Sequence, residues 1–201
     1  MKKFFHDYSY TIVRMLINQI AIAIFGTSLA VATVTAHGGA DSFDVFTLVV
    51  SIFSACFYLF LIYNLSWTVG AKDRISVDVK KKPYRPYLGL VLSLIANIPN
   101  LILVAINAIA TFTGAKTVES IAEILSRFLN GMYWGTMTVV RIFYDGEWIQ
   151  LQCFWVSFLV AVLPAVLTSG LAYYLGHKNF KFFGFITDKK PKNPIDRPNM
   201  K

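Results

Sequence analysis

Four apolar stretches without a single Asp, Glu, Lys or Arg limit what this chain can fold into more than any other feature. Each is at least 22 residues long, and a helix needs about 20 mostly apolar residues to cross the hydrocarbon core of a bilayer. The composition agrees, because 56% of the residues are hydrophobic and only 15% are charged. We therefore predict an all-α, polytopic integral membrane bundle with four spans, at about 15–36, 45–69, 87–113 and 149–175.

The first apolar stretch is interpreted as a retained span rather than a signal peptide. Lys2 and Lys3 precede it, as basic residues precede the apolar part of a secretory signal. However, the run from Met15 to Ala36 is longer than such a signal needs, and another span follows it. We expect one transmembrane domain over 1–187 and a basic, proline-containing, disordered tail over 188–201.

The lysines and arginines predict how the spans are oriented. Sixteen of the 19 lie in the N-terminal segment, in the loop of 72–85 or in the C-terminal tail. Cytoplasmic loops carry such an excess, so both termini and this loop are expected in the cytoplasm. The pattern is typical of a bacterial multi-pass protein of the cell membrane. The net charge of +8 is thus a topology signal, and we expect no nucleic-acid partner.

The region of about 117–143 is predicted to form an amphipathic helix at the outer face. Apolar residues recur there at helical spacing, whereas Glu119, Glu123 and Arg127 follow one another at four-residue intervals on the other side. Glu123 and Arg127 suit a surface ion pair. The apolar run of 128–140 is too short to span, so we expect a shallow re-entrant or interfacial segment. A complete fifth span is the alternative.

Span three carries the most unusual polar residues of the chain. Spacings of four, three and seven put these residues on one helix face: Ser93, Asn97, Asn100 and Asn107. Pro99 lies between two of the asparagines and is expected to break the helix, because it cannot donate a backbone hydrogen bond. This face suits either hydrogen bonds between helices or a substrate or ion pathway. Candidate partners in span one are Asn18 and Gln19.

Span four carries a stripe of small residues spaced four apart: Ser157, Ala161, Ala165 and Ser169. Small residues let helices approach closely in lipid. The stripe is either a contact within the chain, or a seam for a second copy or another membrane subunit. Pro164 lies inside this span, and we expect it to kink the helix.

Basic residues flank the spans at the predicted cytoplasmic face: Lys80, Lys81, Lys82, Arg85, Lys178 and Lys181. Such cations attract the headgroups of anionic lipids at the membrane surface. They serve as ordinary anchors, as a lipid-binding surface or as a docking site for a cytoplasmic partner.

The sequence offers little for catalysis. None of the motifs for a serine nucleophile, a zinc protease or a phosphate-binding loop occurs, and no acid lies within the apolar stretches. Cys56 and Cys153 lie at different predicted depths, so we expect no disulfide. No zinc or iron–sulfur spacing occurs, and we expect no metal site and no cofactor.

The leading hypothesis is a non-enzymatic transporter component or an accessory subunit of a membrane complex, with a membrane-protein partner or a second copy of itself. The alternatives are a protein that binds anionic lipid or the membrane surface by itself, and a small membrane enzyme.

Overall fold

The computed structural model describes residues 2–36, 45–81, 83–144, 147–151 and 154–180. Several positions that the sequence singles out lie outside these ranges: Lys82, Cys153, Lys181 and the predicted tail of 188–201.

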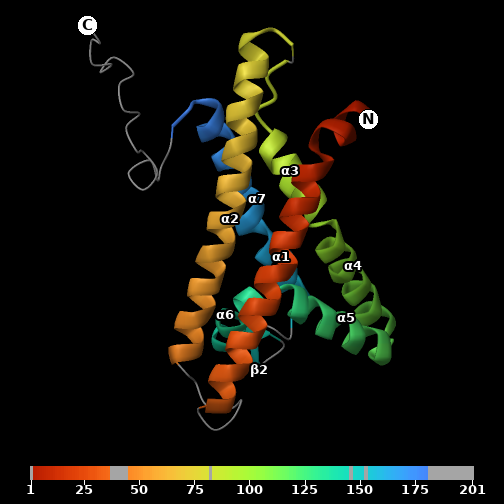
Figure 1. The fold of residues 1–201 in the computed structure, drawn as a ribbon. Helices are drawn as coiled ribbons and strands as arrows, with labels where there is room; N and C mark the ends of the chain where they lie inside the picture. The colour runs from red at the N-terminus through yellow and green to blue at the C-terminus, as the bar shows by residue number, and fades with distance from the viewer. Residues whose placement is uncertain (1, 37–44, 82, 145–146, 152–153, 181–201) are drawn as a thin grey trace, which may run out of the picture.

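Long helices dominate the structure, as Figure 1 shows. Three are long and apolar enough to cross a membrane: α1 (Lys2–Ala36), α2 (Val45–Asp78) and α7 (Trp155–His177). A fourth candidate span consists of α3 (Leu88–Ala96) and α4 (Ile98–Thr113), which are bent by 58° relative to each other. The prediction of an all-α membrane bundle with four spans is confirmed, with the bent pair counted as one span.

One end of the bundle carries most of the charge of the described residues, and we call it the basic end. Here α1 and α3 begin and α2 and α7 end, at the top of Figure 1. We call the opposite end the far end. The cations of the basic end include Lys72, Arg74, Lys80, Lys81, Arg85 and Lys178.

Helices α2, α3 and α7 pack very closely near the basic end because glycines meet backbone there. A Cβ atom added at Gly70 would lie 2.2 Å from the carbonyl oxygen of Tyr173, and one at Gly89 would lie 2.5 Å from that of Ser169. Gly176 approaches the backbone of Trp67 in the same way. Without a hydrophobic force between helices in lipid, such backbone contact is a main source of packing energy.

The segment after α4 was predicted as an amphipathic helix followed by a shallow re-entrant or interfacial segment. It consists of α5 (Lys116–Leu129), a 3-10 turn η1 (Gly131–Tyr133) and a short helix α6 (Trp134–Val139). Its turn is not at the surface, because Gly131 packs against Ala23 and Thr27 in α1. Glycine at 131 allows this approach, since a Cβ would lie 1.9 Å from the Thr27 hydroxyl oxygen.

The tip of this segment therefore lies in the bundle interior, and we call α5, η1 and α6 together the re-entrant hairpin. Gly135 continues along α2, where an added Cβ would lie 2.4 Å from the carbonyl oxygen of Thr47. With 14 residues, α5 does not meet the length of a complete fifth span.

A short antiparallel β-hairpin precedes α7, and the sequence analysis did not predict it. Strand β1 (Arg141–Tyr144) pairs with β2 (Glu147–Gln150), with Tyr144 opposite Glu147. Helix α7 consequently begins at Trp155, whereas span four was expected from about 149. The apolar character of Trp148 and Ile149 belongs to a strand and not to the first turn of the span.

Candidate functional site

Span three is broken in the bundle interior, at Asn97. Asn97 is 3% exposed and adopts φ −89° and ψ 5°, between α3 and α4. Its side-chain amide donates to the carbonyl oxygen of Ser93 at 2.9 Å, and this oxygen also accepts from the Asn97 backbone N–H at 3.0 Å. Pro99 falls in the first turn of α4, where a missing backbone N–H leaves no hydrogen bond unmade. The break thus lies two residues before the proline.

A reciprocal amide pair joins this break to the tip of the re-entrant hairpin. The Asn100 amide nitrogen donates to Asn130 Oδ1 at 3.3 Å, and the Asn130 amide nitrogen donates to Asn100 Oδ1 at 3.0 Å. Asn130 also donates to the carbonyl oxygen of Ser126 at 2.9 Å. Both asparagines are at most 2% exposed. We call Ser93, Asn97, Asn100, Asn130 and the tyrosines described next the polar junction.

Two tyrosines from other elements complete the polar junction. Tyr58 of α2 is 2% exposed and belongs to the same buried cluster as Ala96, with Tyr133 packed against that cluster. The hydroxyls of Ser93 and Tyr133 are buried without a hydrogen-bond partner among the described residues. A buried polar atom without a partner is costly, so these two hydroxyls are available to a water molecule or a polar solute.

Sequence reasoning missed Asn130, although a signal was present. Ala122, Ser126 and Asn130 follow at four-residue spacing, and all three are buried on the face of α5 that packs against α4. A small-residue stripe that ends in an asparagine predicts a close helix contact with a hydrogen bond at its end.

The other polar residues predicted for this region are placed less closely together. Asn107 is buried in α4, and its carbonyl oxygen accepts from the Thr111 hydroxyl at 3.0 Å. Gln19 is buried and Asn18 is half-buried in α1. No hydrogen bond joins either of them to span three in the part of the chain that the structure describes.

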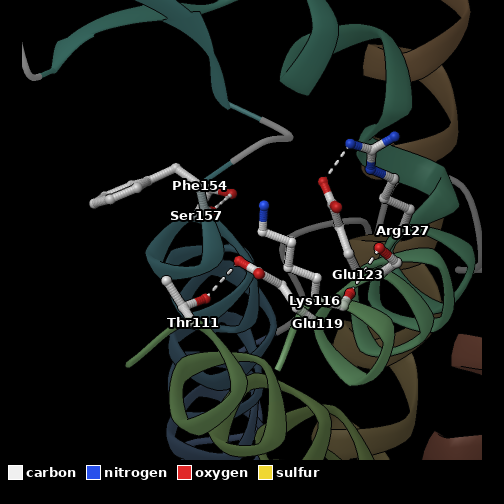
Figure 2. A network of polar contacts seen from close by, with 8 residues as sticks. Thr111, Lys116, Glu119, Glu123, Arg127, Phe154 and Ser157 are labelled. Atoms are coloured by element: carbon white, nitrogen blue, oxygen red, sulfur yellow. Dashed lines mark hydrogen bonds and ion pairs between the residues drawn. The ribbon is translucent and has the colours of Figure 1, made fainter. Parts of the chain in front are cut away.

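The charged face of α5 turns toward the start of α7 and the end of α4, as Figure 2 shows. The Thr111 hydroxyl donates to Glu119 Oε1 at 2.8 Å, and Arg127 pairs with Glu123 one turn away. The Glu123–Arg127 pair, predicted at the surface, is half-buried. The opposite face of α5 exposes large apolar side chains: Val118, Ile121, Ile124, Leu125 and Phe128. This outward apolar face suits lipid.

The small-residue stripe of span four is covered by other helices of the same chain. The Ser169 hydroxyl donates to the carbonyl oxygen of Gly89 at 2.7 Å and lies 2.8 Å from the Ser66 hydroxyl oxygen. Ser157 and Ala165 are buried, and Ala161 is half-buried. The buried members of the stripe therefore lie in contacts within the chain. Helix α7 continues through Pro164.

A cavity of about 250 Å³ lies at the basic end, around a buried carboxylate. Asp73 is 8% exposed, and its Oδ2 accepts from the hydroxyls of Tyr8 at 2.8 Å and Tyr173 at 3.2 Å. The cavity is lined by these three residues and by Phe4, Asp7, Val77, Lys81, Pro83, Arg85 and Leu88.

Of the cations predicted to face lipid headgroups, some line this cavity and others do not. Lys81 and Arg85 line it. Lys80 lies two residues beyond the end of α2 in a left-handed conformation with φ 54°, and the backbone N–H of Lys81 donates to the carbonyl oxygen of Ser76 at 2.9 Å. This pattern is a Schellman helix end, which fixes the position of Lys81. Lys178 is exposed, with its nitrogen 5.2 Å from the centre of the Tyr174 ring.

The comparisons with known proteins found no similarity. No protein-family model matches the chain, and no curated protein or solved structure matches it at a significant level. The arrangement of the described residues is therefore the basis for any statement of function.

Proposed function

We propose that this chain is a non-enzymatic membrane transport protein, or the transport component of a complex, that moves small uncharged polar solutes through the polar junction. The observation that carries the proposal is the meeting of two broken segments in the bundle interior, joined by Asn100 and Asn130. Non-helical backbone at membrane depth occurs where it is buried in protein or lines a water-filled cavity. Transporters place their substrate sites at such discontinuous helices.

The chemistry of the polar junction supports an uncharged solute. Its side chains are hydroxyls and amides, which both donate and accept hydrogen bonds. Intramembrane carboxylates, lysines and histidines mark ion and proton pathways, and the residues that we assign to the junction include none of these. The orphan hydroxyls of Ser93 and Tyr133 supply hydrogen bonds that a polyol or an amide would complete.

The test is solute flux into vesicles that contain the purified protein. Stopped-flow light scattering after a jump in glycerol, urea or ribitol concentration would follow the swelling of the vesicles. We expect faster swelling than in protein-free vesicles for at least one solute, and loss of this difference with Ser93→Val or Asn97→Leu.

A matched control separates the junction from a general effect of losing an amide. Asn64 is exposed on α2 and donates only within its own helix, to the carbonyl oxygen of Phe60 at 3.0 Å. Asn64→Leu should therefore leave the flux unchanged. Flux equal to that of protein-free vesicles for all three solutes would reject transport by the chain alone. A stoichiometric second protein in mild-detergent extracts would then favour the accessory-subunit alternative.

The gathering of exposed cations at the basic end supports a second candidate, binding to an anionic membrane surface. By the positive-inside rule, we place this end in the cytoplasm. Each lysine or arginine near such a surface contributes about 1 kcal/mol of attraction. Sedimentation with phosphatidylserine nanodiscs would test it: Lys80→Gln with Lys178→Gln should weaken binding, and unchanged binding would reject the candidate.

A further inference from the structure

The cavity at the basic end contains a carboxylate oxygen that the protein leaves open. Asp73 Oδ2 accepts from both tyrosines, whereas Oδ1 has no hydrogen bond among the described residues. No lysine or arginine of the described chain lies within ion-pair distance of Asp73. A carboxylate in a buried position is stabilised by hydrogen bonds or by a cation. Oδ1 is not among the described buried polar atoms that lack a partner, so it is reached by solvent and is open to a donor in the cavity.

The walls around Asp73 combine the features that an ammonium group needs. The rings of Phe4 and Tyr8 lie next to each other, with centroids 5.3 Å apart, and both line the cavity together with Tyr173. Aromatic faces attract a cation, and a carboxylate accepts its N–H groups. One side of the cavity thus suits a primary ammonium.

Two cations on the cavity wall suit an anionic group of the same ligand. Arg85 and Lys81 line the same cavity, and Arg85 is held at the start of α3, where its carbonyl oxygen accepts from the backbone N–H of Leu88 at 3.2 Å. An arginine guanidinium binds phosphate with two parallel hydrogen bonds. A ligand with both an ammonium and a phosphate would therefore match the charges of Asp73, Arg85 and Lys81.

The size and depth of the cavity narrow the ligand further. A volume of about 250 Å³ is below the range of about 300–1,000 Å³ that is usual for drug-sized ligands. Asp73 lies two residues beyond the uncharged stretch of span two, which ends at Ala71. This depth is that of the lipid headgroups, which flank the hydrocarbon core by about 5–8 Å on each side.

We propose that this cavity binds the phosphoethanolamine group, with the ammonium on Asp73 Oδ1 and the phosphate on Arg85 and Lys81. The group can come from phosphatidylethanolamine of the surrounding bilayer or from free O-phosphoethanolamine. The site does not depend on transport through the polar junction. Choline lipids fit it worse, because their quaternary ammonium has no N–H to donate, and phosphatidylglycerol has no cation at all.

Native mass spectrometry of the purified protein, loaded with equal amounts of phosphatidylethanolamine, phosphatidylcholine and phosphatidylglycerol, tests the lipid source. We expect at least ten-fold preferential retention of phosphatidylethanolamine. Asp73→Asn keeps an acceptor for the two tyrosines but loses the charge, and should abolish the preference. Arg85→Gln should reduce it without affecting the fold, because Arg85 is exposed.

Arg74→Gln is the matched control, since Arg74 lies at the same end, is not among the cavity-lining residues and pairs with Asp78 at 3.7 Å. Calorimetric titration of O-phosphoethanolamine into lipid-free protein tests the soluble source. Binding of the free group without lipid preference, lost in Asp73→Asn, would support the site with a soluble ligand. Equal retention of the three lipids together with no binding of the free group, or binding that Asp73→Asn leaves unchanged, would overturn the proposal.

Discussion

A methyl group added at Gly176 would lie 2.2 Å from the carbonyl oxygen of Trp67, which is backbone and cannot rotate away. The same change at Gly170, on the same helix, meets the end of the Leu90 side chain at 2.5 Å. A side chain can adopt another rotamer, whereas two helices must separate to relieve a backbone clash. Gly176 is therefore needed for the close contact between α7 and α2, whereas a side chain at 170 is accommodated by a change in the Leu90 rotamer.

We expect Gly176→Ala to lower the free energy of unfolding by about 1–3 kcal/mol, the usual effect of overpacking. Gly170→Ala should change it by much less. Thermal unfolding in detergent, followed by circular dichroism, measures both variants. Equal effects at the two positions would show that α2 and α7 are not in the contact described.

The amide pair of the polar junction allows a double-mutant cycle. Asn100→Leu removes the donor to Asn130 Oδ1, although Asn130 keeps its bond to Ser126, and Asn130→Leu leaves the Asn100 amide without its partner, so each single variant should lose about 0.6–2 kcal/mol of stability. The double variant should lose less than the sum, because no amide is then left unpaired. Strict additivity in denaturant titrations would argue against the pair.

At the scale of elements, α5 has the reverse orientation of a helix in a water-soluble protein. Its large apolar residues are exposed, and its charged residues turn toward α4 and the start of α7. Helical periodicity alone cannot distinguish the two orientations, because an amphipathic face binds either a protein core or lipid. The sequence predicted the helix, and only the fold reveals which face is covered.

Cysteine labelling tests the lipid contact of α5. In a background of Cys56→Ala and Cys153→Ala, Thr117→Cys in the first turn should react with a membrane-impermeant maleimide in proteoliposomes. Ile124→Cys should react far more slowly, because lipid covers it. Equally fast labelling of the two positions would show that water, and not lipid, contacts the apolar face.

The β-hairpin was predictable from a short signal that the apolar pattern concealed. Asp145 and Gly146 separate two four-residue segments, and Asp-Gly is a preferred two-residue turn between paired strands. The uncharged stretch of 148–176 was assigned wholly to span four because charge, and not turn chemistry, set its boundary. The re-entrant tip was harder to predict, since its depth depends on Gly131 meeting α1.

For the whole molecule, apolar length predicted the bundle and its spans, because the bilayer thickness fixes how long a spanning helix must be. The cavity could not be predicted in this way. Tyr8 and Tyr173 reach Asp73 across 65 and 100 residues of sequence. Only helix packing decides that these three side chains meet, and a single sequence does not specify which spans are neighbours.

The orientation in the membrane is a prediction at this scale. Fusions of alkaline phosphatase, which is active only outside the cytoplasm, and of green fluorescent protein would report it. We expect fluorescence from a fusion after Lys201 and phosphatase activity from a fusion after Gly114, at the far end. The reverse pattern would place the basic end outside and contradict the positive-inside rule for this protein.

The bend at Asn97 also has a mechanical consequence. Helix α3 is held against α7 at Gly89, whereas α4 packs mainly against α5. The 16 residues of α4 form an arm about 24 Å long. A rotation of about 10° at the hinge would move the far tip of this arm by about 4 Å. The Asn100–Asn130 pair lies near this bend. A small displacement of the pair would therefore move the far tip of α4 by a larger distance.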